Sequence, residues 1–101
     1  DLLRFGDASL DLAGGKLCCG DKSVRLSAKE FDVMRLLMQA GGGNIPKEVI
    51  LTHVWGFDSD AVENNVEVYV GFLRKKLKSL GPRVQIAAVR RMGYHLEAAA
   101  P

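Results

Sequence analysis

The chain has 101 residues, of which 48% are apolar and 26% charged, and its formal net charge is +2. This length fits one domain with its own core, and the composition excludes disordered and collagen-like chains. No apolar run approaches the ~20 residues of a membrane-spanning helix, and the first residues do not resemble a signal peptide. Because the chain begins at Asp1 rather than Met, we expect it to be part of a longer protein.

The two cysteines, Cys18 and Cys19, are adjacent. Neighbouring residues of a strand point to opposite faces, so a disulfide between them would be strained. No further ligands follow at the spacing of a zinc site, and His53 and His95 are isolated from each other. We therefore expect reduced thiols and a cytoplasmic protein without a metal or cofactor.

Short strands are predicted over the first 26 residues. Brief apolar or alternating runs are separated there by glycine-containing turns, which is typical of an antiparallel meander. The expected strands are Leu2–Phe5, Leu10–Leu12, Leu17–Cys19 and Val24–Leu26.

Helical spacing begins after Ser27, which forms a capping box with Glu30. The first helix has an apolar face and stops at Gly41–Gly43. Pro46 suits the first turn of a second helix, which Gly56 ends. The apolar face of the first helix consists of Phe31, Met34, Leu37 and Met38.

The longest helix is predicted from about Glu63 to Leu80, and a hairpin of Val84–Val89 and Tyr94–Leu96 follows it. We expect residues 98–101 to be a flexible tail. The predicted fold class is α+β. It is a winged helix-turn-helix over residues 1–97, with an N-terminal antiparallel β-meander, three helices and a C-terminal β-hairpin wing. The core stripe of the longest helix is Val66, Val70, Leu73, Leu77 and Leu80.

Charge is distributed unevenly along the chain. Residues 1–63 carry seven Lys/Arg and ten Asp/Glu, a balance of −3, whereas residues 64–91 carry seven Lys/Arg against one Glu, a balance of +6. A basic segment of this kind indicates a polyanionic partner, although a solvated helix face would also explain it.

A second set of side chains on the longest helix mixes amide, aromatic, apolar and ammonium groups, and we expect it to lie roughly opposite the core stripe. This mixture suits base edges and phosphates in a DNA major groove, but the aromatic residues could instead cover a secondary core patch. Gly71 within the helix indicates close approach to another backbone or to DNA. The set is Asn65, Val68, Tyr69, Phe72, Lys75 and Lys76.

The hairpin turn carries Arg90 and Arg91 side by side. An arginine at such a tip can enter a narrow minor groove, while a solvated turn is the alternative interpretation.

Four motifs, in order, resemble the C-terminal effector domains of OmpR/PhoB-type response regulators over about residues 2–97. The first resembles the opening of the family's first helix, the second its second-helix ending, the third its recognition helix and the fourth its wing. They are residues 26–31 (LSAKEF), 53–57 (HVWGF), 64–77 (NNVEVYVGFLRKKL) and 89–94 (VRRMGY).

The resemblance assigns roles to individual residues. It implies that Asn64, Asn65, Val68, Tyr69 and Phe72 face the major groove, and that Arg74 and Lys75 meet backbone or bases. It also implies that Arg90 enters the minor groove with Arg91 beside it, and that Trp55 and Tyr94 touch phosphates. The loop that contacts RNA polymerase in several relatives corresponds to Phe57, Asp58, Ser59, Asp60 and Ala61.

These features favour sequence-specific binding of duplex DNA as the output of a two-component phosphorelay. The family implies a head-to-tail dimer on direct repeats and a receiver domain outside this chain. The alternative is a protein-interaction module that docks a receiver domain or RNA polymerase. An enzyme is rejected, because the sequence offers no nucleophile–base pair, metal constellation or phosphate-binding loop.

Overall fold

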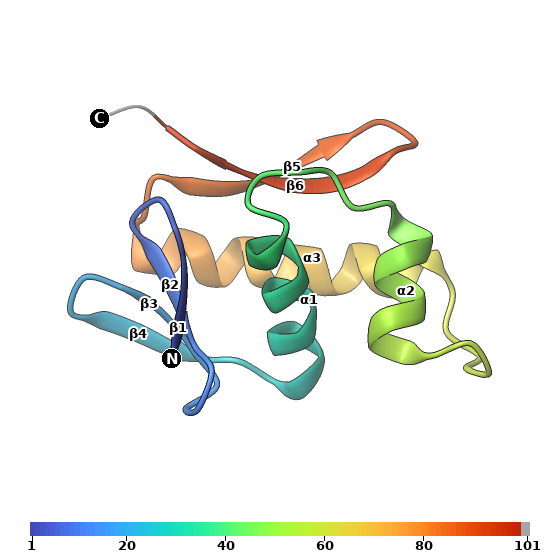
Figure 1. Ribbon diagram of the computed structural model, residues 1–101, viewed down its shortest axis with the longest axis horizontal. Coiled ribbons are helices and arrows are strands. Elements are labelled where there is room, and N and C mark those ends of the chain that lie inside the picture. The colour runs from blue at the N-terminus through green and yellow to red at the C-terminus, as the bar shows by residue number, and fades with distance from the viewer. Residues whose placement is uncertain (100–101) are drawn as a thin grey trace.

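The four-stranded sheet, three helices and hairpin follow one another in the predicted order (Figure 1). The structure is a computed structural model that describes residues 1–99. It confirms the α+β winged-helix class. The elements are β1 (Leu2–Phe5), β2 (Ala8–Asp11), β3 (Lys16–Cys19), β4 (Lys22–Arg25), α1 (Ala28–Gln39), α2 (Lys47–Trp55), α3 (Glu63–Leu80), β5 (Val84–Val89) and β6 (Gly93–Ala98).

The N-terminal meander has the strand order β1-β2-β3-β4. β1 has the predicted bounds and β3 begins one residue earlier than predicted, whereas β2 and β4 both begin and end earlier. The turn between β1 and β2 pairs Phe5 with Ala8, so β2 starts at Ala8 and not at Leu10. It stops at Asp11, whose Oδ1 accepts hydrogen bonds from two backbone N–H groups of the following turn. Leu12 therefore lies in that turn and is exposed.

β4 ends at Arg25, one residue earlier than predicted. Leu26 lies beyond the strand, where its N–H donates to the Gly15 carbonyl and its side chain is buried. Cys18 and Cys19, on β3, are free and half-buried.

The helix boundaries follow the predicted caps closely. At the start of α1, Ser27 Oγ accepts from the Glu30 N–H at 3.3 Å, and Glu30 Oε1 accepts from the Ser27 N–H at 2.7 Å. Pro46 is the N-cap of α2 rather than a residue of its first turn, with φ −60° and ψ 147°. The predicted range of α3 is confirmed, and Gly81 ends it in the left-handed conformation.

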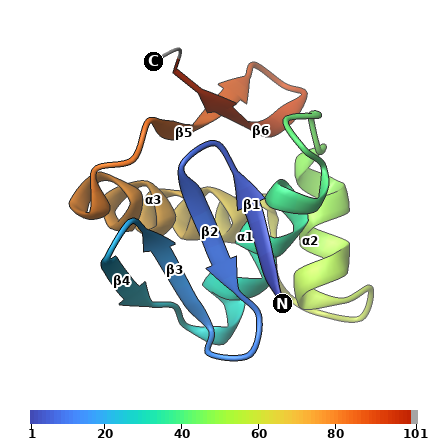
Figure 2. The ribbon, with the colours of Figure 1, turned by 60° about the vertical axis from the view of Figure 1, so that its left-hand side comes forward.

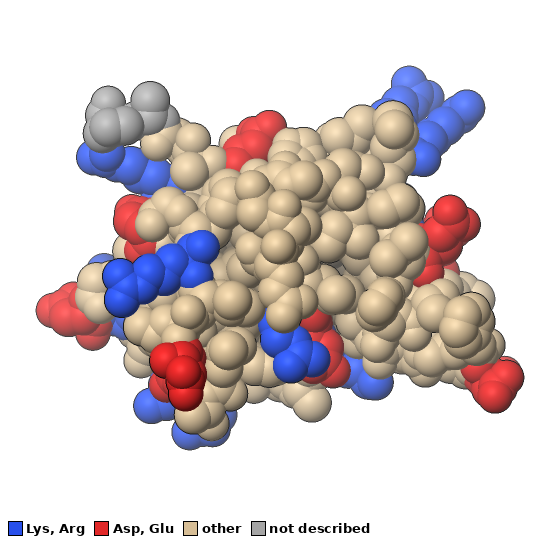
Figure 3. All heavy atoms as spheres, in the orientation of Figure 1, with Lys and Arg blue, Asp and Glu red and all other residues tan. Residues whose placement is uncertain are grey.

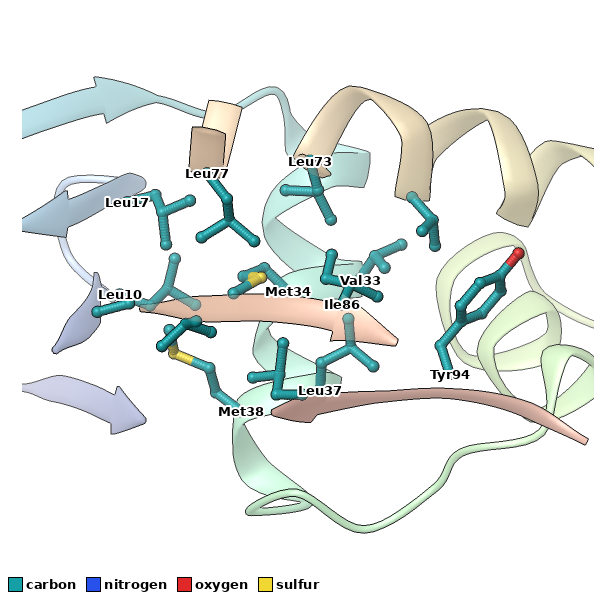
Figure 4. Packing of buried hydrophobic residues seen from close by; sticks show 14 of the residues in the cluster. Leu10, Leu17, Val33, Met34, Leu37, Met38, Leu73, Leu77, Ile86 and Tyr94 are labelled. Atoms are coloured by element: carbon teal, nitrogen blue, oxygen red, sulfur yellow. The ribbon is translucent and has the colours of Figure 1, made fainter. Parts of the chain in front are cut away.

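The core is formed where α1, α3, the meander and the hairpin meet (Figure 4). Leu10 and Leu17 come from the meander, while Leu73 is fully buried on α3 and Ile86 comes from the hairpin. All five residues of the predicted α3 stripe are buried. Both sheets contact α3, which fixes the hairpin relative to the helix (Figure 2).

The last strand, β6, is longer than predicted. Ala98 pairs with Val84, and the Ala99 N–H donates to the Arg83 carbonyl at 2.8 Å. Residues 98 and 99, expected to belong to a flexible tail, therefore pair with the hairpin, and residues 100–101 of the predicted tail lie outside the described residues. Within residues 1–99, no helix is both long and apolar enough to cross a membrane.

Candidate nucleic-acid interface

The outward face of α3 is a stripe of amide, apolar and ammonium groups. Its residues are spaced i, i+4, i+7, i+8 and i+11, which places them on one side of a helix. Val68 and Phe72 are 41% and 44% exposed, unusually high for large apolar side chains. This outward stripe consists of Asn64, Val68, Gly71, Phe72 and Lys75.

Three residues expected on this face lie on the flank of α3 instead. Asn65, Tyr69 and Lys76 are roughly 60–100° from the core stripe at 100° per residue, and all three are half-buried. Asn65 Oδ1 accepts from the Val62 N–H at 2.8 Å and caps its own helix. Lys76 Nζ donates to Glu30 Oε1 at 2.6 Å and to the Arg25 carbonyl, so its ammonium joins α3 to α1.

Aromatic rings connect α2 to the outward stripe. Tyr69 is half-buried between Trp55 and Phe72, with edge-on ring geometry and centroids 5.4 and 5.3 Å away. Lys29 Nζ lies 5.7 Å from the centroid of the Trp55 ring. Tyr69 thus satisfies the secondary-core interpretation, whereas Phe72 remains exposed at the end of the row.

Arg74 joins α3 to the hairpin. Its Nε and Nη2 both donate to the Ile86 carbonyl, at 3.1 and 2.8 Å, and its guanidinium lies over the Tyr94 ring. Tyr94 is only 5% exposed, so most of its ring is a core group. Arg74, which the sequence analysis assigned only to DNA contacts, therefore also holds the wing against the helix.

The wing tip carries three exposed side chains, Arg90, Arg91 and Met92. Its backbone is attached to the α1–α2 connection, because Asn44 Nδ2 donates to the Met92 carbonyl at 2.8 Å. Below it, Tyr94 and Ile45 exchange two backbone hydrogen bonds of 2.9 and 3.0 Å. The tip thus has a fixed position relative to α2 and α3.

Gly93 permits this attachment. A Cβ at this position would lie 2.0 Å from the Ile45 carbonyl oxygen, and φ is +129°. Sequence reasoning missed Asn44 and Ile45, since no local pattern connects them to a turn almost 50 residues away. In the sequence, only Gly93 beside the tip indicated that another backbone segment approaches closely there.

A groove of about 480 Å³ separates the wing from the N-terminal ends of α2 and α3. Arg90 and Arg91 line one side, while Glu48 and Glu63 lie on the other. Lys47 Nζ donates to Glu67 Oε2 at 2.9 Å, and this hydrogen bond raises the pKa of the Lys47 ammonium above its ordinary value. A larger groove of about 540 Å³ lies at the opposite end of the hairpin, near the end of α3.

The α2–α3 loop is the most exposed apolar segment of the domain. Phe57 is 91% exposed and Val62 is 59% exposed. Asp58 and Asp60, between them, are also exposed. This loop projects from the end of the molecule beside α2 (Figure 1).

The basic segment of the sequence is divided in space. Lys and Arg atoms project from the hairpin tip, whereas Asp and Glu atoms lie below them, at the end of the molecule formed by α2 and its following loop (Figure 3). Arg74 and Lys76 take part in intramolecular hydrogen bonds, which leaves Lys75 and the tip arginines as the more accessible cations near the outward stripe.

Comparison with known proteins identifies the family. Residues 21–96 match the family model described as "Transcriptional regulatory protein, C terminal". The transcriptional regulatory protein DltR of Streptococcus agalactiae is 37% identical over 95 residues, 94% of this chain and 42% of the relative. The response regulator MprA of Mycolicibacterium vanbaalenii is 35% identical over 99 residues, which are 98% of this chain and 43% of that relative. The chain thus spans less than half the length of these relatives.

Solved structures agree with this result. The C-terminal domain of the nisin resistance regulator NsrR, a lantibiotic response regulator, superposes with a TM-score of 0.80 at 32% identity, covering 97% of this chain and 99% of that chain. The Klebsiella pneumoniae RstA DNA-binding domain, solved in complex with the RstA box, gives a TM-score of 0.76 at 26% identity. The match covers 94% of this chain and 95% of that chain. The chain belongs to the family of C-terminal DNA-binding domains of OmpR/PhoB-type response regulators, which regulate transcription by binding DNA and are not enzymes.

Proposed function

We propose that this domain binds duplex DNA sequence-specifically, with α3 in the major groove and Arg90 of the wing in the adjacent minor groove. One observation carries the proposal: α3 bears an exposed stripe, and the backbone of the wing tip that carries the two arginines is fixed by hydrogen bonds. In this arrangement, the sugar–phosphate strand between the two grooves passes along the 480 Å³ groove between wing and helices.

The outward stripe supplies the proposed base contacts. An Asn64 amide can pair with adenine, and the exposed apolar side chains of Val68 and Phe72 suit thymine methyl groups. Lys75 neutralises phosphates at the other end of the helix, and Arg74, which is exposed although two of its nitrogens donate to Ile86, adds a positive charge beside it.

The flanking residues have more limited roles in this proposal. Asn65 has its oxygen engaged in the cap, so its Nδ2 group is the part left to donate. Tyr69 supports Phe72, whereas Trp55 and the hydroxyl end of Tyr94 contact the phosphates at the rim.

A second role, contact with RNA polymerase, is favoured by the exposed loop of Phe57, Asp58, Ser59, Asp60 and Ala61. The Phe57 ring is 91% exposed, which leaves it accessible to a partner protein. We further propose that the domain acts in the cytoplasm, joined to a receiver domain, and binds direct repeats as a head-to-tail dimer. The length of the relatives supports the receiver domain.

The experiment begins by selecting bound duplexes from a random pool and then measures affinity across a range of salt concentrations. Affinity for the selected duplex should fall steeply as salt rises, because phosphate contacts release counterions. Arg90→Ala should weaken binding by about 1–3 kcal/mol.

Phe57→Ala is the matched control, since it should leave the DNA affinity unchanged and reduce polymerase recruitment to the same duplex. Salt-independent affinity, or an Arg90→Ala variant that binds like the wild type, would contradict the proposed function.

Gly71 gives an independent prediction. A Cβ at this position meets no atom within 4 Å, so no close packing within the domain requires glycine there. Gly71→Ala should stabilise the helix by about 1 kcal/mol, seen as a higher Tm, and yet weaken DNA binding because the methyl group occupies the outward stripe. An unchanged affinity would show that this part of α3 is not close to DNA.

A further inference from the structure

The wing turn contains a backbone conformation that its sequence does not favour. Arg91 has φ +65°, and every other described residue with positive φ is a glycine. An L-residue is disfavoured there because its Cβ crowds the following carbonyl oxygen. Strain of this kind persists where the surrounding structure imposes it, and it is concentrated at functional sites.

The contacts around the turn impose this conformation. The Met92 N–H donates to the Val89 carbonyl at 2.9 Å, and the Met92 carbonyl accepts from Asn44 at 2.8 Å. Gly93 follows directly and packs against the Ile45 carbonyl. The backbone on both sides of Arg91 is therefore fixed, and the turn cannot relax without releasing the wing.

The tip places two guanidinium groups and an exposed thioether together. Arg90 and Arg91 are both exposed, and within residues 1–99 neither forms an ion pair with a carboxylate. Two adjacent like charges are best accommodated where the negative potential is strongest, and a narrow A·T-rich minor groove provides that potential. Guanidinium is also more weakly hydrated than ammonium, so it loses less hydration free energy when it enters a groove.

Met92 favours a groove over an isolated phosphate. Its side chain is 60% exposed beside the two arginines. Apolar side chains at the tips of minor-groove binders contact sugars and base steps, which a water-exposed phosphate does not offer.

We propose that Arg91 is a specificity-determining residue that selects sites whose base pairs under the wing are A·T-rich, and that the fold tolerates a strained backbone to present it. This inference rests on the proposed DNA-binding function. It assigns to Arg91 a different effect from that of Arg90: a preference among sequences in addition to affinity.

The test uses two duplexes that share the selected α3 site and differ only under the wing, one with A·T and one with G·C pairs. The wild type should prefer the A·T duplex by about tenfold, and Arg91→Gly should reduce this preference to below about threefold. The Tm of Arg91→Gly should equal or exceed that of the wild type, since glycine relieves the strain.

Arg90→Gly is the matched control for strain, because Arg90 does not have a positive φ and glycine there should lower the Tm. The inference is overturned if Arg91→Gly keeps the A·T preference, if it weakens both duplexes equally, or if it lowers the Tm as Arg90→Gly does. Failure of the wild type to bind either duplex would instead refute the proposed function.

Discussion

Gly93→Ala should destabilise the domain by about 3 kcal/mol and weaken DNA binding by at least as much as Arg90→Ala. The added Cβ would lie 2.0 Å from the Ile45 oxygen and 2.7 Å from the Ile45 carbonyl carbon. Because backbone cannot rotate away as a side chain can, the chain must separate there, and both hydrogen bonds between Ile45 and Tyr94 are lost. Thermal unfolding and binding to the selected duplex, measured where the variant is still folded, test this.

Gly81→Ala is the control that measures backbone strain without the steric clash between the added Cβ and Ile45. Gly81 has φ +74° but no atom within 4 Å of its added Cβ, and it lies at the end of α3. We expect a loss of about 1 kcal/mol in stability and no change in DNA affinity. If Gly93→Ala were no more harmful than Gly81→Ala, the wing would not be held by this contact.

Glu30→Gln should be the second large effect, a loss of about 2 kcal/mol in the free energy of unfolding. Glu30 is 5% exposed, and its Oε1 accepts from both Ser27 N–H and Lys76 Nζ. The amide cannot balance the ammonium charge, so Lys76 is left partly buried without its carboxylate. Chemical denaturation at neutral pH measures the loss.

Two further variants test whether the Glu30 result depends on burial. Glu67→Gln removes the more exposed Lys47–Glu67 pair and should destabilise the domain far less than Glu30→Gln does. The double variant Glu30→Gln/Lys76→Met should recover much of the loss, since no unpaired charge remains and the glutamine oxygen can still accept from the Ser27 N–H. Equal losses for Glu30→Gln and Glu67→Gln would contradict the importance of burial.

The Glu30–Lys76 pair predicts that the stability of the domain depends on pH. Burial alone would raise the pKa of the Glu30 carboxyl, but the hydrogen bonds from Lys76 and Ser27 and the charge of Lys76 outweigh it, so this pKa is lowered. The resulting stability is present above the ordinary glutamate pKa of about 4.3 and is lost as pH falls through the lowered value. Wild type should therefore lose more stability than Glu30→Gln over that acidic range.

The elements that could be predicted from the sequence are those specified by local interactions. The Ser27–Glu30 box lies within four residues, and the stripe of α3 repeats over about four turns, so both appear in the linear pattern. The strand limits were less accurate because they depend on register. The two-residue turn at Gly6-Asp7 sets the pairing of Phe5 with Ala8, which an apolar run alone does not specify.

The candidate site was predictable only in part, for a related reason. Helical spacing places Tyr69 and Lys76 away from the core stripe, but whether α1 and α2 cover that flank depends on tertiary packing. The bridge between Ile45 and Tyr94 joins segments that share no periodicity. Arg91 carried a charge signal in the sequence, but its strained φ was visible only in the folded turn.

We propose that α3 and the wing together form the DNA-binding surface. A titration of the ¹⁵N-labelled domain with the selected duplex, followed by backbone amide chemical shifts, tests this proposal directly. The largest changes should fall at residues 64–75 of α3 and residues 89–93 of the wing, with residues 2–25 of the meander nearly unchanged. Changes confined to the meander, or to the groove at the end of α3, would show that DNA binds elsewhere on the domain.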